Sequence, residues 1–180
     1  MKRQHAPSEY GHRVWDSSWL LMDYLQTLRA PAGLKVMEVG CGWGLAGIFC
    51  AQRFGAEVTC VDADPEVFPF LHLHAELNQV AIHTVSKRYE ELTPGDLAGV
   101  NLLMGADICF WDEMPERLLP LFQEALAAGV SEILLADPGR EPFLRLAGAC
   151  EAKFDAQVLR CAVERPLPAS GRILRIRQPH

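Results

Sequence analysis

The chain has 180 residues, of which 49% are hydrophobic and 22% are charged, and its formal net charge is −6. This composition argues against disorder and predicts one globular domain over residues 1–180. The acidic balance gives no general reason to expect a nucleic acid partner. Residues 1–13, expected to be a flexible segment, lack the apolar core of a signal peptide, and no apolar run approaches the roughly 18 residues of a membrane span. We therefore expect a cytoplasmic protein with no membrane partner.

Hydrophobic periodicity predicts helices and strands that alternate along the chain. The first helix is predicted over residues 15–29, with Asp16 or Ser17 as its N-cap. Strands are predicted at 34–40, 57–64, 82–86, 100–107 and 131–137, and further helices at 44–55, 65–79, 114–129 and 141–153. Residues 90–99 are rich in turn formers, and two final strands at 155–164 and 171–178 have no helix between them.

This alternation predicts an α/β fold, a Rossmann-like doubly wound sheet with helices on both faces. The sheet should have seven strands, mostly parallel, with the last two forming an antiparallel hairpin at one edge. In such sheets ligands bind beyond the carboxyl ends of the strands, where the strand order reverses.

The six cysteines and six histidines form no metal-binding pattern. No two cysteines stand in a CxxC pair, and several lie within apolar runs. His72 and His74 are two residues apart, so they point to different sides of a helix. We expect reduced, buried thiols and no metal.

A glycine-rich loop follows the first long strand, in the stretch VMEVGCGWGLAG (36–47). Gly42, Gly44 and Gly47 satisfy the GxGxxG pattern of dinucleotide-binding folds. Asp62 stands 20 residues after Gly42, where those folds place a ribose-binding carboxylate. Interpreted in this register, the loop would bind NAD.

A second register fits the strand better, because the strand runs directly into Gly40 and the turn pattern is then GxGxG at residues 40, 42 and 44. Glu38, two residues before the loop, would repel a pyrophosphate by about 4 kcal/mol at 4 Å and intermediate dielectric. S-adenosylmethionine (SAM) has no phosphate and carries an ammonium and a sulfonium group. We therefore favour SAM over a dinucleotide and over a turn without a ligand.

With these features the chain resembles the class I, seven-β-strand SAM-dependent methyltransferases, and within them the lysine-methyltransferase-like branch. The stretch VWDSSWLLMDYL (14–25) is similar to that branch's N-terminal helix, and LLMGADICFWDE (102–113) to its fourth strand, which ends in Asp-x-x-Tyr. LLADPGREPF (134–143) resembles a segment of the electron-transfer-flavoprotein β-subunit lysine methyltransferases. The motif tyrosine is replaced by Phe110, which leaves Trp111 as a candidate to substitute by stacking.

The resemblance implies roles for individual residues. The methionine part of SAM would lie on the glycine loop, the ribose on the end of the second strand, and the adenine after the third strand. Trp15 would cap the cofactor, although a core tryptophan is the alternative, and Tyr89 would stack on the adenine unless it is an ordinary surface residue. Asp64 is expected to cap the next helix, and Trp19 and Trp43 to serve in packing. The implied cofactor-binding residues are Trp15, Glu38, Gly40, Cys41, Gly42, Gly44, Asp62, Ala63, Tyr89 and Ala106, with Arg88 beside the adenine.

The implied reaction is an in-line displacement, for which the enzyme aligns the groups and excludes water. A lysine acceptor has a free pKa of about 10.4 and must first lose a proton. Phe110 and Trp111 would desolvate it. Asp107, and after it Glu113, would position the ammonium; a carboxylate also stabilises that cation, so we expect Asp107 to orient more than to deprotonate. Arg140 either grips an acidic patch on a protein substrate or is a solvated turn residue.

The sequence thus predicts a SAM-dependent methyltransferase whose most favoured acceptor is a protein lysine. A small-molecule N- or O-methyltransferase stays open as the alternative within the enzyme class. A non-catalytic SAM-binding or partner subunit is the alternative from another class.

Overall fold

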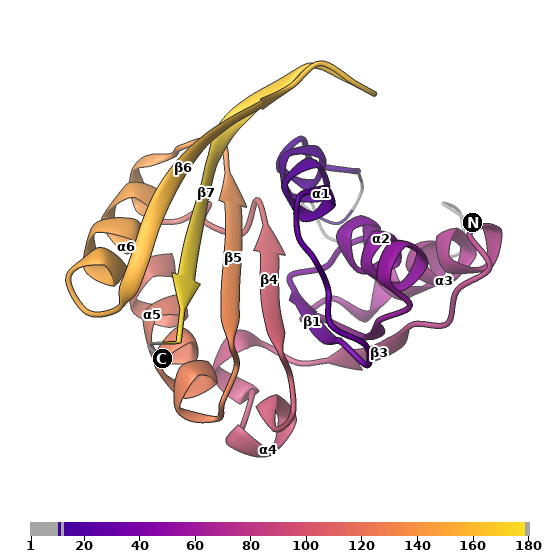
Figure 1. The fold of residues 1–180 in the computed structure, drawn as a ribbon, viewed down its shortest axis with the longest axis horizontal. Coiled ribbons are helices and arrows are strands. Elements are labelled where there is room, and N and C mark those ends of the chain that lie inside the picture. Colours follow the sequence, from indigo (N-terminus) through magenta and orange to yellow (C-terminus); the bar gives the residue numbers. More distant parts are fainter. Residues whose placement is uncertain (1–10, 12, 179–180) are drawn as a thin grey trace.

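One twisted sheet of seven strands organises the chain, in the order β3-β2-β1-β4-β5-β7-β6 (Figure 1). The computed structural model describes residue 11 and residues 13–178, so the predicted flexible segment lies almost entirely outside the described part. The strands are β1 (Lys35–Val39), β2 (Glu57–Asp62), β3 (His83–Ser86), β4 (Leu102–Ala106), β5 (Glu132–Asp137), β6 (Asp155–Val163) and β7 (Ala169–Arg177). The predicted α/β architecture, mostly parallel with an antiparallel end, is confirmed.

The described chain has six α-helices and two short 3-10 helices, of which α1 precedes the first strand and the others lie between strands. Within the turn-rich residues 90–99, where no helix was predicted, the chain forms α4 and the end of η2. The predicted helix over 65–79 divides into η1 and α3 because proline residues stand near the start of each. The bounds are α1 (Ser17–Gln26), α2 (Leu45–Phe54), η1 (Pro65–Val67), α3 (Phe68–Leu77), η2 (Tyr89–Glu91), α4 (Pro94–Leu97), α5 (Met114–Ala127) and α6 (Glu141–Glu151).

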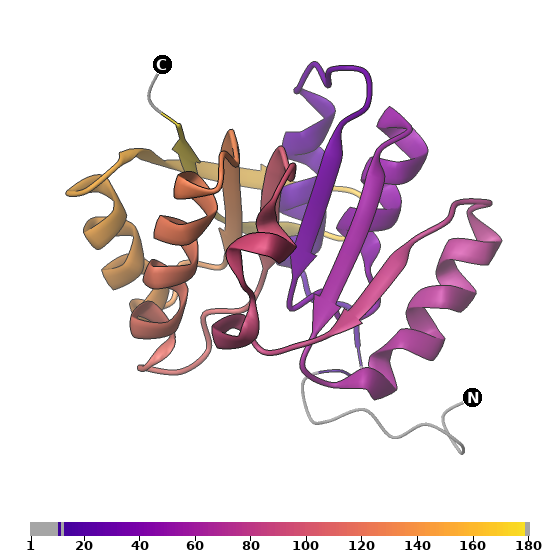
Figure 2. The same cartoon turned by 90° about the horizontal axis from the view of Figure 1, so that it is seen from below.

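The central strands alternate their side chains between two cores, as expected for a sheet covered on both faces. Val36 packs in the core beneath α1 and α2, whereas its neighbour Met37 packs in the core beneath α5 and α6. The two layers of helices are visible in Figure 2. Successive side chains along a strand point to opposite faces, and both faces are covered by helices. The central strands are therefore almost continuously apolar, and Glu38 is an exception.

In the C-terminal hairpin, the second strand, β7, borders the parallel strands, and the first strand, β6, forms the edge of the sheet. β7 lies antiparallel between β5 and β6, with Arg172 opposite both Asp137 and Arg160. Because β5 ends at Asp137, opposite Arg172, the pairs that Cys161 to Val163 make with β7 lie beyond it. The hairpin therefore projects past the carboxyl end of β5, as the top of Figure 1 shows.

Asp16 occupies the N-cap position of α1, one of the two positions predicted, but its side chain does not cap the helix. Its backbone has helical angles (φ −64°, ψ −30°), whereas capping requires an extended residue. The hydroxyl of Ser17 is buried without a hydrogen-bond partner. The N–H of Ser17 instead donates to Oδ2 of Asp107 at 2.8 Å. The acceptor for the helix start is therefore supplied by the residue that follows β4.

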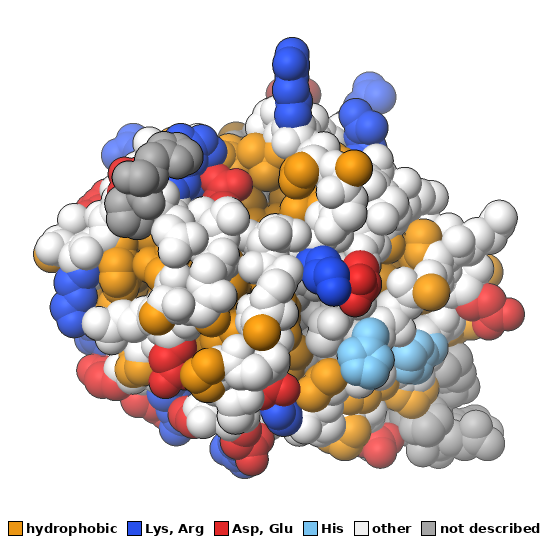
Figure 3. All heavy atoms as spheres, turned by 60° about the horizontal axis from the view of Figure 1, so that its bottom comes forward, with side chains coloured by type: hydrophobic (Ala, Val, Ile, Leu, Met, Phe, Trp, Pro, Cys, Tyr) orange, Lys and Arg blue, Asp and Glu red, His pale blue; other side chains and the backbone are white. Residues whose placement is uncertain are grey.

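Charged side chains on the face in Figure 3 are interspersed with hydrophobic ones, and acidic and basic groups lie side by side. None of the helices within residues 13–178 combines the length and apolar character needed to cross a membrane.

Candidate functional site

The loop between β1 and α2 turns at Gly40, which has φ +61° and no room for a side chain. A Cβ at this position would lie 2.5 Å from Cγ2 of Ile108 and 2.8 Å from the hydroxyl of Tyr89. Both the left-handed backbone and this close approach require glycine. The predicted tight turn at Gly40 is therefore present, and it brings the ends of β1 and β4 close to η2.

Two backbone N–H groups of the loop region donate to carboxylates of the chain itself. Oε2 of Glu38 accepts from the N–H of Gly47 at 2.8 Å, and Oδ2 of Asp62 accepts from the N–H of Gly42 at 2.9 Å. In a dinucleotide site, N–H groups at the start of the helix would face the pyrophosphate. Here two of these donors are already satisfied by side-chain carboxyl groups of the chain, which disfavours a phosphate ligand.

Glu38 is the most deeply buried carboxylate of the loop region, with 3% of its surface exposed. Burial raises its pKa from 4.5 to about 7, although the hydrogen bond from the Gly47 N–H acts in the opposite direction. Burial also raises the pKa of Asp62, whose Oδ1 accepts from the N–H of Asp64 at 2.9 Å. A cationic ligand beside these groups would favour their charged forms.

A cavity of about 360 Å³ lies over this loop at the carboxyl ends of the strands. It brings together the residues to which the sequence assigned cofactor-binding roles, except Gly44 at the N-cap position of α2, and the catalytic candidates, except Glu113. Asp64 also lines the cavity and accepts from the N–H of Glu66, which confirms its predicted capping role. The predicted residues lining the cavity are Trp15, Glu38, Gly40, Cys41, Gly42, Asp62, Ala63, Tyr89, Ala106, Asp107, Phe110 and Trp111.

Aromatic rings form one wall at the mouth of the cavity. The rings of Trp15 and Phe110 meet edge to face with centroids 5.3 Å apart, and Trp111 follows at 6.0 Å from Phe110. Trp111 is 48% exposed. The guanidinium of Arg13 lies 3.9 Å from the centroid of the Trp15 ring, within the range of a cation–π contact. This wall is apolar inside and open to solvent at one side.

The structure adds to the sequence interpretation for two aromatic residues. Tyr89 is partly buried and packs against the core, so the surface-tyrosine alternative is wrong. Trp43 packs as predicted, stacked on Phe70 at 5.3 Å, but it also lines the cavity and donates from Nε1 to the carbonyl of Gly11 at 2.9 Å. Its place inside the glycine loop was the available signal for this second role.

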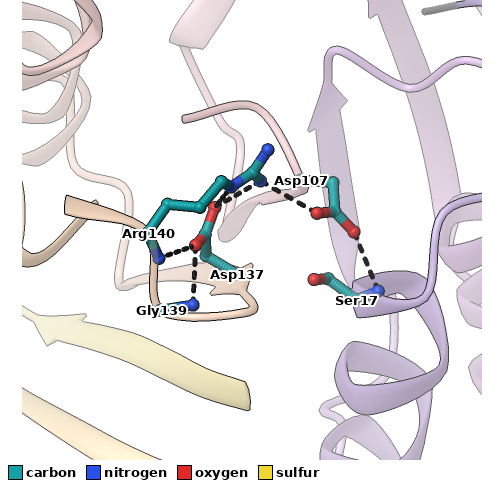
Figure 4. Close-up of polar contacts among 5 residues, drawn as sticks. All are labelled: Ser17, Asp107, Asp137, Gly139 and Arg140. Carbon is teal, nitrogen blue, oxygen red and sulfur yellow. Dashed lines mark hydrogen bonds and ion pairs between the residues drawn. The ribbon is translucent and has the colours of Figure 1, made fainter. Parts of the chain in front are cut away.

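Asp107 lies at the centre of a buried polar network (Figure 4). Its Oδ1 accepts from Nη2 of Arg140 at 2.8 Å and its Oδ2 from the N–H of Ser17 at 2.8 Å, so both oxygens are engaged. Its backbone has φ +59°, a strained conformation for a non-glycine residue. Burial raises the pKa of Asp107, and the contacts with Ser17 and Arg140 act to lower it.

Arg140 is not a solvated turn residue, because its guanidinium pairs with buried carboxylates of the chain. Its Nε donates to Oδ2 of Asp137 at 3.0 Å, and its guanidinium lies 4.4 Å from the centroid of the Phe110 ring. Asp137 is fully buried and also accepts from the backbone N–H groups of Gly139 and Arg140. Sequence reasoning missed this network, which joins residues 33 positions apart.

The remaining candidates lie away from the cavity. Glu113, the second candidate for positioning an ammonium, is exposed at the start of α5 and does not line the cavity. No group of three or more His, Cys, Asp or Glu side chains suited to a metal occurs among residue 11 and residues 13–178.

Comparison with known proteins finds a matching family model and related proteins. A sequence model of the family described as "Lysine methyltransferase" matches residues 2–141. Over 131 residues the chain is 33% identical to the zebrafish (Danio rerio) Protein N-lysine methyltransferase METTL21A, covering 68% of this chain and 58% of that protein. Over 142 residues it is 25% identical to the Xenopus laevis electron transfer flavoprotein beta subunit lysine methyltransferase, covering 74% and 56%. The chain thus spans little more than half the length of these relatives.

Among solved structures, the fold matches that of M. capricolum TrmK in complex with S-adenosyl-homocysteine (SAH). The TM-score is 0.61 at 9% identity, over 93% of this chain and 70% of that one.

Proposed function

The chain belongs to the lysine methyltransferase family, and on that premise we propose that it transfers a methyl group from SAM to a lysine side chain of a protein. The proposal is supported by the family match and by the cavity at the carboxyl ends of β1 and β4. Because the chain spans only part of the length of its relatives, the activity of the whole protein is part of this proposal.

The main support for SAM as the cofactor is that backbone N–H groups of the glycine loop already donate to carboxyl groups of the chain. Because Gly42 and Gly47 already donate to Asp62 and Glu38, the loop presents carboxylates where a dinucleotide needs donors. An ammonium and a sulfonium suit such a site, and a pyrophosphate does not. The turn at Gly40, where any Cβ would collide with neighbouring atoms, lets the backbone line the cavity directly.

SAM, when bound, supplies a methyl group activated by the positive sulfur. We assign its methionine end to Glu38 and the Gly40–Gly42 turn. The ribose hydroxyls are assigned to Asp62, because each carboxylate oxygen that accepts one backbone N–H has a further lone pair to offer. Tyr89 and Ala63 would border the adenine.

On the acceptor side, the protein's contribution is to place an amine and keep water away. Phe110 and Trp15 present apolar surface to the cavity, and Trp111 extends it toward solvent. Desolvation by these rings lowers the pKa of a lysine that enters between them and so favours the neutral nucleophile. Asp107 orients rather than accepts a proton in this scheme, because both of its oxygens already hold donors of the chain.

Titration calorimetry with SAH tests the cofactor assignment. We expect binding to the wild-type protein, loss of binding in Asp62→Ala, and retention in His83→Ala. His83 is an exposed residue of β3 outside the cavity. His74 would be unsuitable as a control, because it packs against Trp43, which lines the cavity. Binding of NAD in place of SAH would overturn the assignment.

Incubation with radiolabelled SAM and cell extract tests the acceptor. Label in a protease-sensitive band that yields methyl-lysine on hydrolysis supports a protein lysine. Label confined to the small-molecule fraction would instead establish the small-molecule alternative, and SAH binding without any transfer would indicate a non-catalytic subunit.

We also propose that the protein is cytoplasmic. All six cysteines are free, and all but Cys161 are buried. Reduced thiols of this kind are typical of proteins in reducing compartments.

A further inference from the structure

A short segment before and at the start of α1 forms one side of the cavity. Gly11, Arg13, Val14, Trp15 and Ser18 all line it. We call Gly11 together with residues 13–18 the strap. It faces the glycine loop on one side and the end of β4 on the other, so its position determines how closed the cavity is.

Two tethers of different chemistry hold the strap. On the side of the glycine loop, Nε1 of Trp43 donates to the carbonyl of Gly11 at 2.9 Å, a bond between neutral groups. On the side of β4, the N–H of Ser17 donates to the carboxylate of Asp107 at 2.8 Å. The second bond is charge-assisted and lies at the N-terminus of a helix, where a negative charge is favourable.

The second tether depends on a residue that does not line the cavity. Arg140 holds Oδ1 of Asp107, which leaves Oδ2 directed at Ser17 (Figure 4). The same guanidinium pairs with Asp137, so it separates two buried carboxylates that are 3% and 0% exposed. Without this cation the two charges would repel each other, and Asp107 would be favoured in a neutral or rotated form.

Arg140 also supports the aromatic wall. Its guanidinium lies 4.4 Å from the Phe110 ring centroid, and Phe110 in turn contacts Trp15 of the strap at 5.3 Å between centroids. Both routes from Arg140, the polar one through Asp107 and the aromatic one through Phe110, therefore end on the strap.

We propose that Arg140 is a positioning residue that fastens the strap across the cavity through Asp107 and thereby slows release of the bound cofactor. The proposal rests on the proposed function for the identity of the cofactor, whereas the tether itself concerns only residues of this chain. The planar guanidinium reaches both carboxylates at once, and a lysine ammonium at the same position is expected to satisfy them only in part.

The test combines two measurements on Arg140→Gln, Arg140→Lys and the control Arg177→Gln. Arg177 is a half-exposed arginine whose Nε lies 3.5 Å from Glu132, near the end of β7 remote from the cavity. Amide hydrogen exchange by NMR reports the Ser17 N–H, and stopped-flow displacement of SAH reports cofactor release. Circular dichroism confirms that each variant is folded.

In Arg140→Gln we expect the Ser17 amide to exchange about tenfold faster and SAH to dissociate about tenfold faster, as expected when a charge-assisted hydrogen bond weakens. Arg140→Lys should fall between wild type and Arg140→Gln, and Arg177→Gln should match wild type in both measurements.

An unchanged Ser17 exchange rate in folded Arg140→Gln would overturn the tether, and faster exchange with unchanged SAH release would overturn the role of the strap. If Arg140→Gln does not fold, Arg140→Lys decides by the same two readouts. If the wild-type protein binds no SAH, the cofactor assignment fails; the Ser17 measurement then still decides the tether, and the proposed effect on cofactor release falls with the assignment.

Discussion

The substitution Glu38→Gln is expected to remove a pH dependence of folding stability. Burial raises the pKa of Glu38 from 4.5 to about 7, so the folded protein holds this proton more tightly than the unfolded chain. A group of this kind contributes stability that is fully present below pH 4.5 and is lost as the pH rises to 7. The difference between the two pKa values corresponds to about 3 kcal/mol.

The variant keeps a side-chain oxygen that can accept the N–H of Gly47, but it has no charge to bury. We therefore expect the free energy of unfolding of Glu38→Gln, relative to wild type, to grow by about 3 kcal/mol between pH 4.5 and pH 8. Urea unfolding followed by circular dichroism at several pH values measures this difference. Asp62 and Asp107 also titrate with raised pKa values, but their contributions cancel in the comparison.

Glu57→Gln is the matched control, because Glu57 lies on the adjacent strand with its side chain 74% exposed and pairs with Lys35 at 3.4 Å. This substitution should leave the pH dependence of wild type in place. A difference between Glu38→Gln and wild type that is constant from pH 4.5 to pH 8 would refute the reasoning, since it would mean that Glu38 is charged in the folded protein throughout that range.

Two further predictions concern the turn and the mouth of the cavity. Gly40→Ala should lower the free energy of unfolding by about 2–3 kcal/mol in urea melts, because the new Cβ would lie 2.5 Å from Ile108 and 2.8 Å from Tyr89 at φ +61°; a stability equal to wild type would show that the turn relaxes freely. Trp111→Ala should reduce methyl transfer to the identified acceptor about tenfold while leaving SAH affinity in calorimetry unchanged, because Trp111 is half exposed and extends the apolar wall beside Phe110. A loss of SAH affinity instead would move Trp111 from the acceptor side of the cavity to the cofactor side.

Much of the site could be predicted because its signals are local in sequence. The glycine turn follows its strand directly, and Asp62 ends the next strand; β1 and β2 are parallel neighbours, so the two signals meet at one edge of the sheet. The strand pattern likewise predicted a sheet covered by helices on both faces, since short apolar runs that alternate with helices are a local signal. The assigned roles in binding and catalysis stay predictions that the experiments above decide.

The sequence by itself determined the seven strands, the α-helices other than α4, the fold class and the position of the glycine-rich loop, because periodicity and turn chemistry act over a few residues. Only the tertiary structure decided that β7 lies between β5 and β6, that Tyr89 turns inward, and that Asp107 receives the N–H of Ser17 and the guanidinium of Arg140. These last contacts join residues 90 and 33 positions apart. Such pairs depend on which strand ends the topology brings together, and a carboxylate in a sequence does not show which donor will reach it.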